Sequence, residues 1–365
     1  MSAQSTDRAQ DAGAAAVEET GTGREEPARR IVVRRRFPAS LWEGQSKSTL
    51  IMLGVTVLIF LGFGMATPTF LTLGNLSNLA TQVAPIVVVG VAMTFVITSG
   101  QIDLSVGSTI AFVAAISAEL LMSGLDSTTV IILGILAGAA WGLVNGWLAS
   151  YNGIPPFVVT LATMSVIRGV ALLRTEGYSI PMDSRLLLAR LGNMSFLGFS
   201  LSAWVALVVV VLGLILLNTT RFGQYVTGIG SNEESVRRAG VNTRRIKMIC
   251  LVLTGAMAGL AGLLIAARLG SGSANAAQAF ELTVIAAVVL GGTDLFGGRG
   301  SIIGTVIGAV ITGAIANGLT LMGMSPFLTP IVTGCVLILA IWINLRGREV
   351  SDLMSKILGR RRSEA

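Results

Sequence analysis

Ten long apolar runs dominate this sequence. Most of them are 17 to 23 residues long and contain few charged side chains, and an α-helix of about 20 residues crosses the roughly 30 Å of hydrocarbon in a bilayer. Only 12% of the 365 residues are charged, whereas a soluble domain carries about 25%. The sequence therefore predicts an all-α integral membrane protein with about ten transmembrane helices in one compact bundle.

The predicted spans are separated mostly by short connections. They cover residues 49–65, 78–98, 105–122, 128–150, 157–173, 200–217, 246–267, 280–290, 301–322 and 327–345. The eighth is only about half as long as a bilayer is thick, unless residues 274–279 extend it. The sequence leaves open whether this segment crosses fully or is re-entrant.

Basic residues set the expected orientation of the bundle. Of the 26 Lys and Arg residues, eight precede residue 50, six lie between residues 221 and 247, and six follow residue 345. Positively charged loops stay on the cytoplasmic side, so ten crossings place all three groups and both termini in the cytoplasm. We expect residues 1–48 to form a disordered cytoplasmic tail and residues 346–365 to form a basic cytoplasmic tail.

Glycines recur every four residues in three of the predicted spans. On a helix this spacing leaves one face without side chains, so that a neighbouring backbone can approach closely. We therefore expect these three spans to be packed between other helices. The glycines are Gly134, Gly138, Gly142 and Gly146 in the fourth span, Gly255 and Gly259 in the seventh, and Gly300, Gly304 and Gly308 in the ninth.

Two connections between spans share the pattern G-x-x-D-L-x-x-G. An Asp before a helix can accept hydrogen bonds from free N–H groups, and Gly allows a sharp reversal of the chain. Two capped turns explain the pattern, and a structural repeat whose turns move together in gating is the alternative. The first turn contains Gly100, Asp103, Leu104 and Gly107, and the second contains Gly291, Asp294, Leu295 and Gly298.

The connection at residues 218–245 is expected to contain a short polar helix. Ser231-x-x-Glu234 is typical of a capping box, and Gly240 is typical of the residue that follows a helix. Acidic residues suit the start of a helix and basic residues suit its end, as do Glu233 and Glu234, then Arg237 and Arg238. A helix of about two turns is marginal in water, so it either lies on its own protein or docks on a partner.

No pattern in the sequence predicts catalysis. The chain has no His, which excludes His-based acid–base chemistry and most zinc sites. No Lys follows a Gly, which excludes the phosphate-binding loop G-x-x-x-x-G-K-[ST]. We expect a protein that is not an enzyme and that has no cofactor, no metal site and no nucleic-acid partner.

Four ionisable residues lie within or beside the predicted spans. Arg168 is predicted to lie deep in the membrane, whereas the other three are predicted near the outer ends of their spans, where they can reach water. These three are Glu119, Arg268 and Glu281. An ion-coupled carrier needs deep, paired carboxylates, and this set does not supply them.

Five motifs occur in order along the membrane part of the chain. They read GQIDLSVGS at 100–108, NGIPPFVVTLATMSVIRG at 152–169, GSNEESVRRAGV at 230–241, TGAMAGLAGLL at 254–264 and VVLGGTDLFGGRGSIIGT at 288–305. Together they resemble the permease subunit of ribose-type sugar ABC importers, within the wider group that includes branched-chain amino-acid permeases. The resemblance implies that residues 49–345 form a permease domain in the bacterial cytoplasmic membrane.

The resemblance also implies partners and roles. The partners are a second permease copy or a homologue, two cytoplasmic ABC ATPase domains that bind ATP-Mg, and an extracytoplasmic sugar-binding protein. Both G-x-x-D-L-x-x-G turns match the family and are the expected gating turns. The short helix would be the coupling helix, seated in an ATPase groove through Ser231, Glu233, Glu234, Arg237, Arg238 and Gly240.

The function that the resemblance implies is ATP-driven import of a monosaccharide, which could be a pentose, a hexose or a related polyol. The sugar would follow a weakly binding path, for which the candidate residues are Phe95, Asn145, Phe157, Thr160 and Asn275. An ion-coupled secondary carrier and an ABC permease for another small polar solute, such as a branched-chain amino acid, are the alternatives. The sequence does not identify the sugar.

Overall fold

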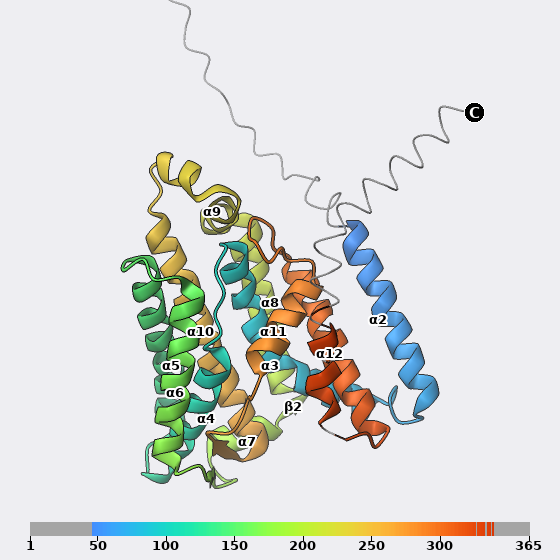
Figure 1. The fold of residues 1–365 in the computed structure, drawn as a ribbon. Coiled ribbons are helices and arrows are strands. Elements are labelled where there is room, and N and C mark those ends of the chain that lie inside the picture. Colours follow the sequence, from blue (N-terminus) through green and yellow to red (C-terminus); the bar gives the residue numbers. More distant parts are fainter. Residues whose placement is uncertain (1–45, 326, 333, 337, 339–365) are drawn as a thin grey trace, which may run out of the picture.

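The computed structural model describes residues 46–325, 327–332, 334–336 and 338. Within these residues the chain is almost entirely helical, and Figure 1 shows the helices side by side in one bundle. Nearly all of the two predicted tails, 1–48 and 346–365, lies outside the described residues, as does the end of the tenth predicted span.

Nine of the ten predicted spans coincide with a helix, and the tenth is described only in part. Six of these helices, α3, α5, α6, α8, α10 and α12, are long and apolar enough to cross a membrane. The total of about ten crossings therefore stays a prediction. The nine helices are α2 (Ser46–Ala66), α3 (Leu73–Thr98), α4 (Val106–Met122), α5 (Ser127–Ser150), α6 (Pro156–Thr175), α8 (Leu201–Thr219), α10 (Thr243–Leu269), α11 (Phe280–Leu290) and α12 (Ile302–Leu321).

α3 lies at the centre of the bundle. It packs on α8, α10, α11 and α12, and its second half is buried on nearly all sides. A helix that is apolar all round is typical either of a protein core or of a membrane span, and the contacts of α3 with four neighbours place it in the core. Thr72 caps the start of the helix: its hydroxyl oxygen accepts a hydrogen bond from the backbone N–H of Asn75 at 3.3 Å.

The glycine faces predicted from the sequence meet each other in the structure. A Cβ atom on Gly138 would lie 2.9 Å from the Cα of Gly259, and one on Gly255 would lie 2.9 Å from the Cα of Gly142. Only glycine therefore lets α5 and α10 touch backbone to backbone. The glycines of α12 do the same on α11, where Gly308 lies against the backbone of Ala287. The predicted packing role is confirmed.

α4 and α11 are short helices, and each follows an irregular segment. α4 has 17 residues and follows residues 99–105, while α11 has 11 residues and follows residues 274–279. Ala277 and Ala279 have positive φ values, 54° and 56°, which non-glycine residues seldom adopt. In Figure 1, α4 lies in the half of the bundle far from α9 (Arg221–Arg238). The eighth predicted span is thus a short helix preceded by irregular chain.

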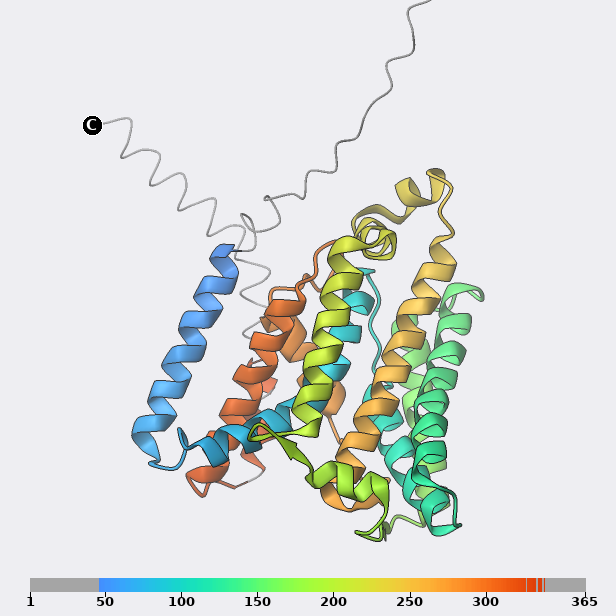
Figure 2. The same ribbon diagram turned by 180° about the vertical axis from the view of Figure 1, so that it is seen from behind.

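The end of the bundle opposite α9 is closed by small elements, seen from behind in Figure 2. β1 (Ser179–Pro181) pairs antiparallel with β4 (Ser271–Ser273), and β2 (Ser195–Phe196) pairs antiparallel with β3 (Phe199–Ser200). α7 (Leu187–Asn193) lies between β1 and β2 in the chain. The β1–β4 pair fixes the chain that enters α11 to the chain that leaves α6.

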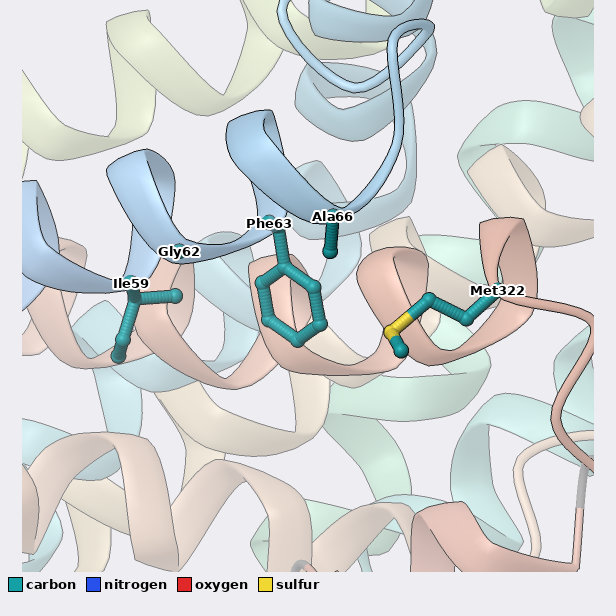
Figure 3. A pocket seen from close by; sticks show the side chains of 5 residues that line it. All are labelled: Ile59, Gly62, Phe63, Ala66 and Met322. Atoms are coloured by element: carbon teal, nitrogen blue, oxygen red, sulfur yellow. The ribbon is translucent and has the colours of Figure 1, made fainter.

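α2 stands at the edge of the bundle and packs on α12 (Figure 2). Between them lies a cleft of about 270 Å³ (Figure 3), lined by Ile59, Gly62, Phe63, Ala66 and Met322. All of these side chains are apolar, so the cleft offers no partner for the hydroxyl groups of a sugar.

Candidate functional site

α9 contains the predicted coupling helix and consists of two helices joined at a kink. Asn232 at the kink has φ −162° and ψ 96°, which is not helical. Its side-chain oxygen accepts a hydrogen bond from the backbone N–H of Ser235 at 2.9 Å. The Ser231 hydroxyl instead donates to the carbonyl of Thr227. The capping residue is therefore Asn232, and the predicted capping box at Ser231 is wrong by one residue.

The end of the second helix is as predicted. Gly240 has φ +83°, and its N–H donates to the carbonyl of Arg237 at 3.0 Å. A left-handed glycine is the usual residue after a helix, because it has no Cβ to clash. The chain then turns into α10, which begins at Thr243.

Two carboxylates organise the charges of this helix. Glu234 pairs with Arg237 and with Arg238, the latter at 2.9 Å. Both arginine side chains are well exposed, at 65% and 80%, so they remain available to a partner. Exposed pairs of this kind contribute little to stability, about 0.3–0.5 kcal/mol each.

The second carboxylate joins the short helix to α10. Glu233 accepts hydrogen bonds from Lys247 Nζ at 3.1 Å and from the Thr243 hydroxyl at 2.9 Å. Burial raises the pKa of the Glu233 carboxyl, but the bonds from Lys247 and Thr243 lower it by more, so the pKa lies below its usual value. The short helix is thus held against the start of a membrane span.

A cleft of about 500 Å³ lies beside the short helix. One wall comes from the connection between α5 and α6, and the other comes from the charged residues of α9 and α10. We call it the charged cleft. Its lining residues are Ala149, Ser150, Tyr151, Gly153, Ile154, Pro155, Pro156, Glu233, Glu234, Arg237, Arg244 and Lys247.

The two predicted gating turns use their Asp residues in the same way. Asp103 Oδ1 accepts from the backbone N–H of Ser105 at 2.9 Å, and Asp294 Oδ1 accepts from the backbone N–H of Phe296 at 3.1 Å. Each carboxylate thus bonds two residues ahead and stabilises its own turn. The surroundings differ, because Asp103 is 1% exposed and Asp294 is only half-buried.

The two turns also touch each other. The N–H of Gly298 donates to the carbonyl of Thr98 at 2.9 Å. A Cβ atom on Gly297 would lie 3.1 Å from the Cα of Gly100 and 3.0 Å from the Cα of Gly230. Gly230 lies two residues before the kink of α9 at Asn232, so both turns meet the base of the predicted coupling helix. We call Gly100, Gly230 and Gly297 the glycine junction.

The other residues of the two turns have packing roles. Leu104 and Leu295 pack on the main apolar core, and Gly291 lies against the backbone of Gly304. Gly107 lies inside α4, so it does not make the sharp reversal that its spacing suggested. A Cβ atom there would overlap the carboxylate of Glu281 and would lie 2.9 Å from the carbonyl oxygen of Ala277.

The structure corrects the prediction for one ionisable residue. Glu119 lies toward the end of its helix and pairs with Arg174, as expected for residues near water. Glu281 is at the start of its helix, but that start lies inside the bundle: its carboxylate lies over Gly107 at the start of α4, and the charge of Arg168 acts on it. Sequence reasoning missed this, because the irregular segment before α11 brings Glu281 deeper than a straight span would.

The five candidate path residues do not come together. Phe95 is 2% exposed and packs on Phe222, while Phe157 is 51% exposed. Asn275 donates to the carbonyl of Gly177, toward the end of the bundle opposite α9. Their role in a path stays a prediction.

Two of these candidates belong to a buried polar network. Asn145 Nδ2 donates to the Ser105 hydroxyl at 2.8 Å, and its Oδ1 accepts from Thr163 at 2.7 Å. The Thr160 hydroxyl lies 3.3 Å from the carbonyl of Ile102. Since these groups bond each other, the network joins α5 and α6 to the segment before α4.

Comparison with known proteins identifies a family of membrane permeases. The family model described as branched-chain amino acid transport system / permease component matches residues 75–341. The chain is 38% identical over 294 residues to the probable ABC transporter permease protein YphD of Escherichia coli strain K12, covering 80% of this chain and 88% of that protein. No solved structure matches the chain.

Two further relatives are named as permeases for a specific sugar. The chain is 39% identical over 293 residues to the ribose import permease protein RbsC of Bacillus subtilis strain 168, covering 80% of this chain and 91% of the relative. It is 35% identical over 306 residues to the L-arabinose ABC transporter permease protein AraH of Azospirillum brasilense, covering 84% and 89%.

Proposed function

Because the chain belongs to the family of branched-chain amino acid transport system permease components, we propose that it is the membrane-spanning subunit of an ATP-driven monosaccharide importer. The relatives named for ribose and arabinose support a pentose or a similar sugar as the cargo. The protein would lie in the bacterial cytoplasmic membrane, with α9 and both termini on the cytoplasmic side.

The observation that carries the proposal is the short charged helix of α9. It projects beyond the spans, as Figure 1 shows, and the bonds from Thr243 and Lys247 to Glu233 hold its first turn to α10. Its exposed arginines, with the charged cleft beside them, offer a surface for an ATPase domain. A partner would also supply the packing that a two-turn helix lacks.

The glycine junction would transmit movement of the short helix to the rest of the bundle. Gly230 at the base of α9 lies against the turn after α3 and the turn after α11. ATP-driven movement of the helix would therefore displace the ends of both spans together. The two turns would act as gating turns through this contact, with no side chain between the backbones to absorb the movement.

The remaining partners follow from the same proposal. ATP-Mg would bind in two cytoplasmic ATPase domains, an extracytoplasmic binding protein would select the sugar, and a second permease copy or a homologue would complete the path. The family description also favours a second cargo, a branched-chain amino acid. Uptake assays with labelled ribose, arabinose and leucine would separate the two.

Reversal of one charge tests the docking of the helix. Glu234→Lys removes the carboxylate that pairs with Arg237 and Arg238 and puts a positive charge at a helix start, where it is unfavourable. We expect much less ATPase domain to co-purify with the permease, while the amount of permease in the membrane stays the same.

The matched control makes the same change at the other end of the molecule. Glu176 follows α6 at the end opposite α9, so Glu176→Lys should leave ATPase association unchanged. Equal association of both variants with the ATPase, together with normal sugar uptake by Glu234→Lys, would refute the assignment.

A further inference from the structure

Arg168 and Glu281 lie deep in the bundle. Arg168 is in α6, a helix long and apolar enough to cross a membrane, about 18 Å along its axis from Pro156 and about 10 Å from Thr175 at 1.5 Å per residue. Glu281 is the second residue of α11, about 14 Å from Leu290. Arg168 is therefore far from both ends of its span, and the carboxylate of Glu281 lies over Gly107 at the start of α4, inside the bundle.

The surface around these two residues is polar and only partly covered. Arg168 donates from Nη1 to the carbonyls of Ala274 at 2.6 Å and Ala276 at 2.8 Å, which fixes the irregular segment before α11. Arg168 and Glu281 are half-buried, and Gln278, in the same irregular segment that Arg168 bonds, is exposed. We call Arg168, Gln278 and Glu281 the polar face.

Lipid cannot cover such a face. Irregular backbone at membrane depth is tolerated only where protein buries it or where it lines a water-filled cavity, and charged side chains in spans face such places as well. The exposed side of Gln278 must therefore meet either another protein surface or water. Two nearby charges with hydrogen-bonding capacity to spare favour water.

The chemistry of the polar face suits a hydroxylated cargo. The guanidinium of Arg168 supplies donors and the carboxylate of Glu281 supplies acceptors, while the amide of Gln278 supplies both. Glu281 makes no hydrogen bond to another side chain among the described residues, so its carboxylate can still accept a hydrogen bond from a ligand. Gly107 keeps this arrangement in place, because any Cβ atom there would collide with the carboxylate.

We propose that Arg168, Gln278 and Glu281 line the translocation path and hydrogen-bond the hydroxyl groups of the sugar as it crosses the middle of the membrane. This inference rests on the proposed function. It also assigns to the path residues other than the five that the sequence suggested.

Access from water is tested first, in the assembled importer with its ATPase and binding-protein partners. Cys335 is exposed and Cys250 is buried, so Gln278→Cys is placed in a Cys335→Ser background and treated with a small charged methanethiosulfonate. We expect Gln278→Cys to react, because only a thiol in water forms the thiolate. Leu212→Cys on α8 is the control: Leu212 is 60% exposed on a helix long and apolar enough to cross a membrane, so we expect lipid to cover the thiol and prevent its reaction.

Contact with the sugar is tested by uptake of labelled ribose, arabinose and xylose into proteoliposomes. Glu281→Gln should lower the uptake rate of the transported pentose about tenfold, as expected when a hydrogen bond to a charged group is weakened. Arg168→Lys should act in the same direction, with the fold better preserved than by an apolar substitution. Glu119→Gln, which changes a carboxylate outside the polar face, should leave uptake nearly unchanged.

ATP hydrolysis stimulated by the binding protein separates this inference from the proposed function. It should persist in Glu281→Gln, since the defect lies in the path and not in docking. An unreactive Gln278→Cys, which would place the face against a second copy, or normal pentose uptake by both Glu281→Gln and Arg168→Lys would overturn the inference. Loss of ATPase association in the unmodified protein would instead refute the proposed function.

Discussion

Substitution of Gly230 by Ala would test whether the glycine junction links α9 to the two turns. In the structure, the added Cβ atom would overlap the carbonyl of Thr98 and the backbone nitrogen of Gly298. These two groups form a hydrogen bond of 2.9 Å with each other. The methyl group can fit only if α9 moves away or if this bond breaks.

The expected cost combines three effects. Overpacking costs about 1–3 kcal/mol, and loss of the bond between Gly298 and Thr98 adds about 0.5–1.5 kcal/mol. Ala favours a helix over Gly by about 1 kcal/mol, which offsets part of this. Gly230→Ala should therefore destabilise the folded protein by about 0.5–3.5 kcal/mol.

Gly228 in the same helix provides a matched control. A Cβ atom on Gly228 would lie 3.0 Å from a methyl group of Val236, and such a side chain can move aside. Gly228→Ala should therefore be neutral or slightly stabilising, because it gains helix propensity without breaking a backbone contact.

Stability and transport are both measured for this pair. Thermal unfolding in detergent can be followed in a Cys335→Ser background by the reaction of Cys250, which is buried in the folded state. We expect Gly230→Ala to unfold at a lower temperature than Gly228→Ala and to transport less sugar per ATP hydrolysed. Equal unfolding temperatures and equal coupling in the two variants would refute the role of the junction.

Two further predictions concern packing and pH. Gly142→Leu should destabilise the protein strongly, because a Cβ atom at Gly142 already lies 2.9 Å from the Cα of Val252. Gly169→Leu should be tolerated, since a Cβ atom at Gly169 meets nothing within 4 Å; similar unfolding temperatures for the two would contradict this packing. The pKa of Glu233 is lower in the folded state than its usual value, so its stabilising bonds are present above the unfolded-state pKa and are lost as pH falls through the folded-state pKa. The unfolding temperatures of the wild type and Glu233→Gln should therefore converge as pH falls from neutral through the folded-state pKa of Glu233, and a constant difference would show that the charge of Glu233 is not involved.

The elements of the fold were largely predictable from the sequence. Apolar length and glycine spacing are local properties, and they predicted the nine helices that coincide with spans and the close packing of three of them against neighbours. The short helix of α9 and its terminal Gly240 were also predicted. The capping residue was misplaced by one position, because Ser231 and Asn232 are both good N-caps and only the backbone angles of Asn232 distinguish them.

The candidate site was less predictable, because its groups come from distant parts of the chain. The repeated turns were visible as a pattern, yet nothing in the pattern showed that Gly100 and Gly297 touch each other and Gly230. The depth of Glu281 was misjudged for a related reason. A window of apolar residues gives the length of a span, but it does not show where an irregular segment places the start of the helix.

The sequence by itself determined that this chain is an integral membrane protein. It has too few charged residues to cover a water-exposed surface, and its long apolar runs match the thickness of a bilayer. It also determined which helix faces could approach closely, because the spacing of the glycines shows which face of a helix has no side chains. Only the tertiary structure decided which backbones meet at the glycine junction and which polar groups share the interior with Arg168. Those arrangements depend on the packing of helices that lie more than a hundred residues apart in the chain, and no local pattern records that packing.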